Sequence, residues 1–123
     1  MYPADRKYTK DHEWINVSGG QGRVGITEYA TKQLGDIVYL ELPEVGKTVK
    51  QGEVLGTIES VKAVSEIFAP VSGEVVEVNK GLADKPEAVN QDSHGSWMVG
   101  IKLADPGELN NLLDATQYAE LAK

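Results

Sequence analysis

Apolar and polar residues alternate along several short segments of the chain, which is the pattern of strands with one buried face. The repeat predicts strands over residues 12–17, 23–26, 37–42, 54–61, 63–69, 74–78 and 97–103. Two of these segments are the most regular, and we expect each to have one apolar face, formed by Trp97, Val99, Ile101 and Leu103 in one segment and by Val38, Leu40 and Leu42 in the other.

Helical signals are confined to short stretches. Thr27 is a good helix N-cap and Gly35 a good C-terminal residue, so the sequence predicts a short helix between them. Capping signals at Asp105 and Asp114 predict helices over residues 105–123, packed on the sheet, and residues 105–108 are predicted to form an acidic capping box with Glu108. We expect an irregular lead-in over residues 1–10 and a loop with one helical turn over residues 80–89.

Short, regularly punctuated strands without long helices between them are typical of antiparallel sandwiches and barrels. The sequence therefore predicts a mainly β fold, a sandwich or flattened barrel with short peripheral helices. A chain of 123 residues is long enough for one domain with a buried core, so residues 1–123 are expected to form a single domain.

Composition excludes several function classes. The net charge of -7 argues against a face that neutralises nucleic-acid phosphates. The chain has no cysteine, and therefore neither disulfides nor thiol chemistry of its own. No apolar run approaches the length of a membrane span, and the N-terminal residues lack the features of a targeting segment, so a cytoplasmic protein without membrane or nucleic-acid partners is expected.

The sequence contains no recognisable catalytic set. His12 and His94 lie far apart in the chain, neither at metal-ligand spacing with another histidine, and we interpret both as structural or solvated. The glycines mark turns and form no phosphate-binding loop. The many glutamates are expected to form a solvated acidic face: Glu41, Glu44, Glu53, Glu59 and Glu66. The chain is therefore not expected to be an enzyme.

Lys62, the central residue, lies between two strand-like runs, residues 54–58 and 64–68. The junction contains no Gly, Pro, Asn or Asp, so it is not one of the common two-residue hairpin turns. A lysine at such a tip stands clear of the body, although most lysines are simply solvated. Because a free lysine amine is protonated at neutral pH and is a poor catalyst, the chemistry that this position favours is acylation of Lys62 by another enzyme.

The residues around Lys62 resemble the lipoyl-attachment segment of the glycine cleavage system H protein family. The resemblance rests first on residues 59–63, Glu-Ser-Val-Lys-Ala, and on residues 69–75, Ala-Pro-Val-Ser-Gly-Glu-Val. It extends over essentially the whole chain from Tyr8, through the segments 12–14, 25–30, 34–39, 41–46, 77–79, 86–90 and 97–98. The attachment motif alone is moderately specific, and the combination is highly specific.

The resemblance implies a barrel-sandwich hybrid fold with lipoic acid in amide linkage to Lys62, and Glu59, Val61 and Ala63 as the rest of the attachment motif. It implies a carrier that takes the aminomethyl group of glycine from the glycine decarboxylase (P-protein) to the aminomethyltransferase (T-protein). The dihydrolipoamide dehydrogenase (L-protein) then reoxidises the carrier. A lipoate ligase or lipoyl transferase is implied as a further partner.

The resemblance also implies a surface cleft in which the loaded arm rests, with Glu13 contacting the amine and Glu66 nearby. Plain exposed strand carboxylates are the alternative for both residues. The chain departs from the family pattern at Gln33, where some relatives have histidine, and at Ser93-His94, where Pro-Tyr is usual. These departures concern the cleft and leave the attachment segment unchanged.

Other functions are weaker alternatives. An H-like relay that supplies lipoyl groups to other dehydrogenase complexes would have nearly the same sequence features. A biotin carrier favours methionines beside its lysine, where this chain has Val61 and Ala63. An unmodified binding module is the remaining possibility.

Overall fold

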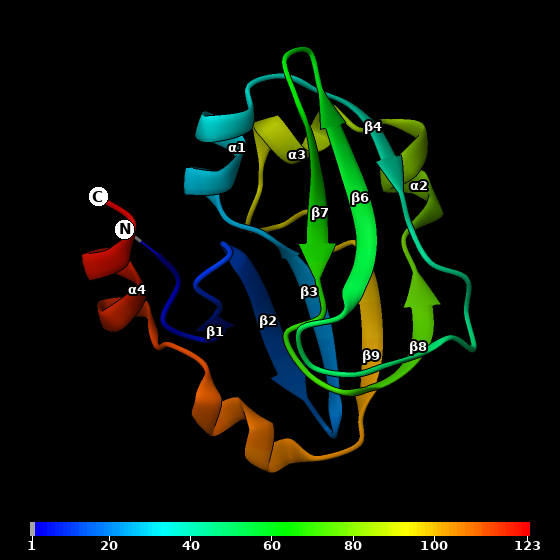
Figure 1. Cartoon of the computed structure of the whole chain (residues 1–123), viewed down its shortest axis with the longest axis vertical. Coiled ribbons are helices and arrows are strands. Elements are labelled where there is room, and N and C mark those ends of the chain that lie inside the picture. Colours follow the sequence, from blue (N-terminus) through cyan, green and yellow to red (C-terminus); the bar gives the residue numbers. More distant parts are fainter. Residues whose placement is uncertain (1) are drawn as a thin grey trace.

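The computed structural model describes residues 2–123 as two antiparallel sheets that pack face to face, with helices at the periphery (Figure 1). One sheet has six strands in the order β1-β2-β3-β9-β8-β5, and the other has three in the order β4-β6-β7. The strands are β1 (Lys7–Tyr8), β2 (Glu13–Ser18), β3 (Gln21–Ile26), β4 (Ile37–Glu41), β5 (Thr48–Val49), β6 (Val54–Ser60), β7 (Val64–Phe68), β8 (Gly73–Val78) and β9 (Val99–Leu103). The helices are α1 (Glu28–Leu34), α2 (Lys80–Asp84), α3 (Ala88–Gln91), the 3-10 helix η1 (Pro106–Asn111) and α4 (Ala115–Leu121).

The core is formed by the inner faces of both sheets. Ile15, Val24, Val75 and Ile101 of the larger sheet are completely buried. Ile58 and Ile67 contribute from the smaller sheet, in a cluster that helices α2 and α3 complete with Leu82 and Val89. The expected mainly β fold with peripheral helices is confirmed. The two sheets share no strand ladder among the described residues, so the expected flattened barrel is not closed.

The alternation pattern fails where strands bulge. The register of β4 against β6 shifts between Ile37 and Tyr39, so the expected shared face of Val38, Leu40 and Leu42 is wrong. Ile37 and Leu40 are buried, whereas Val38 is 49% exposed. The shift arises because a bulge adds one residue to one strand and reverses the side-chain alternation beyond it.

The expected apolar face of Trp97 to Leu103 is also wrong at its first residue. Met98 and Val99 are both buried and belong to different core clusters. This change lies just before β9 begins, so strict alternation does not extend to Trp97. The Trp97 ring lies on the outer surface, under the guanidinium of Arg23.

Segments expected to be irregular contain ordered elements. Residues 80–89, expected to form a loop with one helical turn, contain α2 and the start of α3, joined by residues 85–87. Lys7–Tyr8 forms a strand that pairs with β2. The Asp105 side chain caps η1, but Glu108 does not complete a capping box. The Glu108 carboxylate instead accepts hydrogen bonds from the amide and hydroxyl of Ser72, both at 2.7 Å.

The last helix, α4, begins with the expected capping box of Asp114 and Gln117. Its Tyr118 is completely buried and stacks on Tyr8 with ring centroids 4.8 Å apart. The Tyr118 hydroxyl lies 2.7 Å from His12 Nδ1 and 2.6 Å from the Thr27 hydroxyl. These contacts connect the C-terminal helix to β1 and to the start of α1. None of the helices in residues 2–123 has the length and apolar character of a bilayer-spanning segment.

Replacing Gly73 with alanine should lower the free energy of unfolding by about 2 kcal/mol, because an overpacked site strains its neighbours. A Cβ at Gly73 would collide with the backbone carbonyl of Lys102 on the paired strand. Gly81→Ala in α2 is the matched control, since its Cβ would lie 3.7 Å from the closest atom, in ordinary contact. The control should gain up to about 1 kcal/mol from helix propensity. Urea denaturation measures both changes. Equal changes in the free energy of unfolding of the two variants would contradict the predicted clash at Gly73.

Candidate functional site

Lys62 lies at the tip of the hairpin formed by β6 and β7, which stands at the upper end of the molecule in Figure 1. The last paired residues are Glu59 and Val64. Beyond them, the Ser60 amide donates to the Ala63 carbonyl at 2.8 Å and closes the turn. Val61 and Lys62 therefore form the outermost part of the hairpin, as the sequence predicts.

The turn is held by a side chain that sequence reasoning missed. The Ser60 hydroxyl oxygen lies 3.3 Å from the Lys62 amide and 3.1 Å from the Ala63 amide, and accepts from both. It also lies 3.2 Å from the Ala63 carbonyl, to which it donates. Serine hydroxyls commonly organise turns in this way, so Ser60 was the available signal in a junction without glycine or asparagine.

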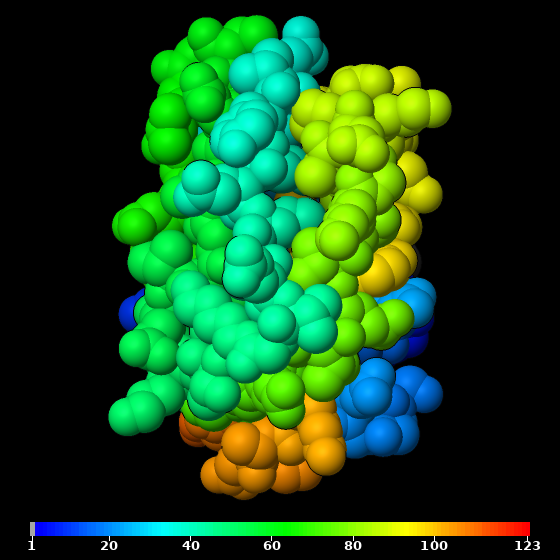
Figure 2. All heavy atoms as spheres, turned by 90° about the vertical axis from the view of Figure 1, so that its right-hand side faces the viewer, coloured from blue at the N-terminus to red at the C-terminus, as the bar shows by residue number. Residues whose placement is uncertain are grey.

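The hairpin tip is tied to the segment between α1 and β4. The Val61 amide donates to the Asp36 carbonyl at 3.0 Å. Asn90 of α3 fixes that segment in turn, because its side chain donates to the Gly35 carbonyl at 2.9 Å and accepts from the Ile37 amide at 2.8 Å. Figure 2 shows the green hairpin packed beside this cyan segment at the top of the molecule.

The side chain of Lys62 is exposed, and its stem passes Gly35. A Cβ built on Gly35 would lie 3.7 Å from Lys62 Cε. Within residues 2–123, no hydrogen bond or ion pair engages the Lys62 amine. The amine is therefore accessible to a modifying enzyme, and no internal carboxylate competes for it.

The outer face of the smaller sheet carries acidic and apolar side chains below the tip. Cross-strand pairing aligns Tyr39, Glu59 and Val64 in one row, and Glu41, Thr57 and Glu66 in the next row on the same face. Several large apolar side chains on this sheet and its hairpin tip are exposed: Val38, Tyr39, Val54, Val61 and Val64. Glu59 and Glu66 thus lie on one surface with exposed apolar groups, which is the composition of a docking surface with a charged rim.

Glu13 occupies a different environment from the other glutamates. It is 2% exposed, its Oε1 accepts from the Thr9 hydroxyl at 2.6 Å, and its Oε2 accepts from the Phe68 amide at 3.2 Å. Because Phe68 ends β7, the carboxylate connects the larger sheet to the smaller one. Burial raises the pKa of Glu13 to about 7, and the two hydrogen bonds oppose that rise.

Two cavities lie near the predicted arm residues. One, of about 350 Å³, lies beside the end of β7 and is lined by Glu13, Asp11 and Phe68, but not by Glu66. The other, of about 490 Å³, lies between α1 and α3 next to Gly35. Ser93 and His94 line this second cavity and Gln33 does not. The departures from the family pattern at residues 93–94 therefore shape a hollow close to Lys62.

Residues 6–123 match the glycine cleavage H-protein family. The chain belongs to this family. Among curated relatives, the glycine cleavage system H protein of Koribacter versatilis is 55% identical over 121 residues, covering 98% of this chain and 94% of the relative. The probable glycine cleavage system H protein of Pyrococcus abyssi is 59% identical over 118 residues, covering 94% and 88%.

A solved member of the H-protein family has the same fold. The crystal structure of a glycine cleavage system H protein from Mycobacterium marinum superposes with a TM-score of 0.88. The two sequences are 44% identical, and the match covers 97% of both chains. The arrangement of sheets and hairpin described above is thus an H-protein fold.

The Ser60 hydroxyl should be a determinant of order at this H-protein hairpin. Ser60→Ala removes its hydrogen bonds within the turn and should lower the free energy of unfolding by about 1 kcal/mol. Amide exchange at residues 61–63 should accelerate more than exchange in β2. Ser65→Ala is the matched control, because that hydroxyl makes no hydrogen bond within residues 2–123. Equal exchange rates in both variants would contradict the role of Ser60.

Proposed function

We propose that this chain carries lipoic acid in amide linkage to the Lys62 amine and serves as the carrier of the glycine cleavage system. The observation that supports this most directly is an exposed amine, without an ion-pair partner in the described chain, at the tip of an ordered hairpin. An acylating enzyme needs that amine free and reachable, and both conditions are met.

The residues around Lys62 fit a lipoyl group. Val61 and Ala63 flank the lysine with modest side chains, Val61 being 68% exposed. Glu59 lies on the outer face one pair below the tip, where a lipoate ligase or lipoyl transferase can contact it together with the lysine. The amide bond would replace a charged amine with a neutral group, and no buried contact of Lys62 would be lost.

Within the glycine cleavage system, we propose that the carrier receives the aminomethyl group of glycine at the P-protein and delivers it at the T-protein. The L-protein then restores the oxidised carrier. The lipoyl dithiolane supplies the sulfur to which the cargo attaches, and this chain supplies reach and orientation. The net charge of -7 favours steered, short-lived contacts with partners that have basic surfaces.

Glu13 and Glu66 are proposed to hold the loaded arm. Glu66 lies on β7 between the hairpin tip and Phe68, and Glu13 lines the cavity at the Phe68 end of that strand. A carboxylate at this position can pair with a protonated amine brought down along β7. Because the pKa of Glu13 is raised to about 7, a nearby cation would favour the charged form of its carboxyl group.

Intact mass spectrometry tests the attachment. The unmodified chain is incubated with a lipoate ligase and lipoate, and we expect one lipoyl increment, located on Lys62 by peptide mapping. A glycine-loading assay with P-, T- and L-proteins then tests the shuttle. If no increment appears while a known lipoyl domain is modified in the same reaction, the proposal fails. If the increment appears but no glycine is cleaved, the attachment stands and the shuttle fails.

A further inference from the structure

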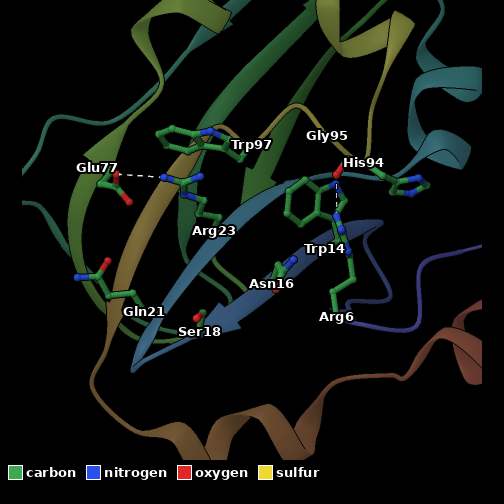
Figure 3. A pocket seen from close by; sticks show the side chains of 10 residues that line it. All are labelled: Arg6, Trp14, Asn16, Ser18, Gln21, Arg23, Glu77, His94, Gly95 and Trp97. Carbon is green, nitrogen blue, oxygen red and sulfur yellow. Dashed lines mark hydrogen bonds and ion pairs between the residues drawn. The ribbon is translucent and has the colours of Figure 1, made fainter.

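A further concave site lies on the outer face of the six-stranded sheet, on the side away from the sheet that carries Lys62 (Figure 3). The pocket has a volume of about 410 Å³, within the usual range for ligand sites. Both tryptophans of the chain, Trp14 and Trp97, line it. The proposed carrier function uses neither this pocket nor its arginines.

We call this site the tryptophan pocket, and two glycines make room for side chains that line it. A Cβ on Gly25 would lie 2.5 Å from Trp14 Cζ2, so the indole can lie flat on β3 only because residue 25 is glycine. A Cβ on Gly100 would lie 2.9 Å from Glu77 Oε1. Gly100 pairs with both Arg23 and Glu77, and its missing side chain lets them meet across β9.

Each tryptophan carries a guanidinium on its face. The Arg6 guanidinium carbon lies 4.5 Å from the Trp14 ring centroid, and that of Arg23 lies 4.3 Å from the centroid of Trp97. Such stacking fixes the plane of a guanidinium while leaving its N–H edge available for a planar acceptor. Two stacked arginines on one face are notable in a chain with a net charge of -7.

The two arginines differ in how far their donors are used. Arg6 is 10% exposed, binds Asp5 at 2.8 Å and donates to the His94 carbonyl at 2.7 Å. Arg23 is 52% exposed, and its guanidinium makes one polar contact within residues 2–123, to Glu77 at 3.5 Å. A charge-assisted hydrogen bond is usually about 2.7–2.9 Å long. Glu77 therefore holds Arg23 loosely and leaves most of its donors open.

The pocket is elongated along β2. Trp14, Asn16 and Ser18 line it from the same side of that strand, a span of about 13 Å at about 3.3 Å per residue. Gln21 adds a second side-chain amide at the far end. This length is that of an extended peptide of about four residues rather than of one small anion. The side-chain amides of Asn16 and Gln21 and the hydroxyl of Ser18 can form hydrogen bonds with the backbone groups of such a peptide.

We propose that the tryptophan pocket binds a short acidic segment of a partner protein, with one of its carboxylates replacing Glu77 on the guanidinium of Arg23. The guanidinium of Arg23, oriented by stacking, can donate two parallel hydrogen bonds to one carboxylate. Glu77 occupies that place loosely in the free protein. The remaining acidic surface repels such a segment, so that its binding is restricted to this face.

Intrinsic fluorescence tests the proposal without a label, because both tryptophans line the pocket. The unlipoylated chain is titrated with a hexaglutamate peptide, a hexaglutamine peptide and free glutamate, at low and at physiological salt. We expect a saturable change with hexaglutamate that weakens as salt rises. Hexaglutamine and free glutamate should produce no saturable change in the same range.

Three substitutions make the test specific. Arg23→Gln should weaken hexaglutamate binding about tenfold or more, because it removes the charged fork. Glu77→Gln should tighten binding about two- to fivefold, since it removes the internal competitor. A damaged fold could not produce that gain. Lys102→Gln is the charge-matched control, because Lys102 pairs with Gln21, two positions along β3 from Arg23, and does not line the pocket.

Clear outcomes would overturn the proposal. Equal binding by Arg23→Gln and the unchanged protein would exclude Arg23 as the ligand. A loss with Lys102→Gln as large as that with Arg23→Gln would mean diffuse electrostatic attraction. Saturable binding of free glutamate with the affinity of the peptide would identify a small-carboxylate site instead. None of these outcomes depends on lipoylation, so a failure here leaves the carrier function untouched.

Discussion

Replacing Lys62 with arginine should abolish lipoylation and reduce glycine cleavage to the background of the assay. A guanidinium keeps the charge and most of the length of the side chain, but it does not accept an acyl group as an amine does. The fold should be unaffected, because Lys62 is exposed and only its backbone contacts the turn. We expect the free energy of unfolding to stay within about 0.5 kcal/mol of the parent value.

The measurement combines intact mass after ligase treatment with urea denaturation of the same samples. Lys47→Arg, on an exposed turn, is the matched control and should accept one lipoyl group like the parent. A lipoyl increment on the Lys62→Arg variant would show that another lysine is the acceptor. Glycine cleavage by a variant without the increment would show that the carrier function does not require the lipoyl group.

The Glu13→Gln variant should lose a pH dependence of stability of about 3 kcal/mol. Burial raises the pKa of Glu13 from 4.5 to about 7, so between these values the folded chain keeps a proton that the unfolded chain releases. The stabilising contribution is complete below pH 4.5 and is lost as pH rises through 7. Glutamine cannot titrate, so this part of the pH profile should disappear.

Urea denaturation at pH 5, 6, 7 and 8 measures this effect as the difference between the parent and variant profiles. A pH-independent loss of stability is expected in addition to this pH-dependent difference, because the glutamine amide cannot satisfy both the Thr9 hydroxyl and the Phe68 amide as the carboxylate does. Asp11, whose charge also raises the pKa of Glu13, is unchanged in the variant. Glu66→Gln, which changes an exposed glutamate, is the control. Parallel profiles for the parent and Glu13→Gln would contradict the raised pKa.

The sequence predicted the strand-rich fold and the hairpin around Lys62 because both depend on local patterns. Thr27 and Gly35 define α1 as expected, and Asp114 with Gln117 defines α4. The errors arise where one strand meets another. The bulge in β4 depends on its pairing with β6, and a single-strand pattern carries no information about it.

The candidate site shows the same division. The exposure of Lys62 follows from the hairpin, but the tie between Val61 and Asp36 joins residues that only the folded chain brings together. The burial of Glu13 depends on β7 packing over the start of β2, so its environment could not be predicted from its place in a polar segment. The tryptophan pocket likewise requires the β3–β9 pairing that puts Arg23 beside Gly100.

The hydrogen bonds of the Lys62 turn have a consequence for enzyme recognition. Ordering one backbone residue opposes binding by about 1–2 kcal/mol, so a disordered four-residue tip would subtract roughly 4–8 kcal/mol from the affinity of a modifying enzyme. Here Ser60, Asp36 and Asn90 have already ordered the tip before any enzyme arrives. A ligase that acts on Lys62 as proposed would therefore meet a rigid epitope, and we expect the five-residue motif alone, in an unfolded chain, to be a much poorer substrate.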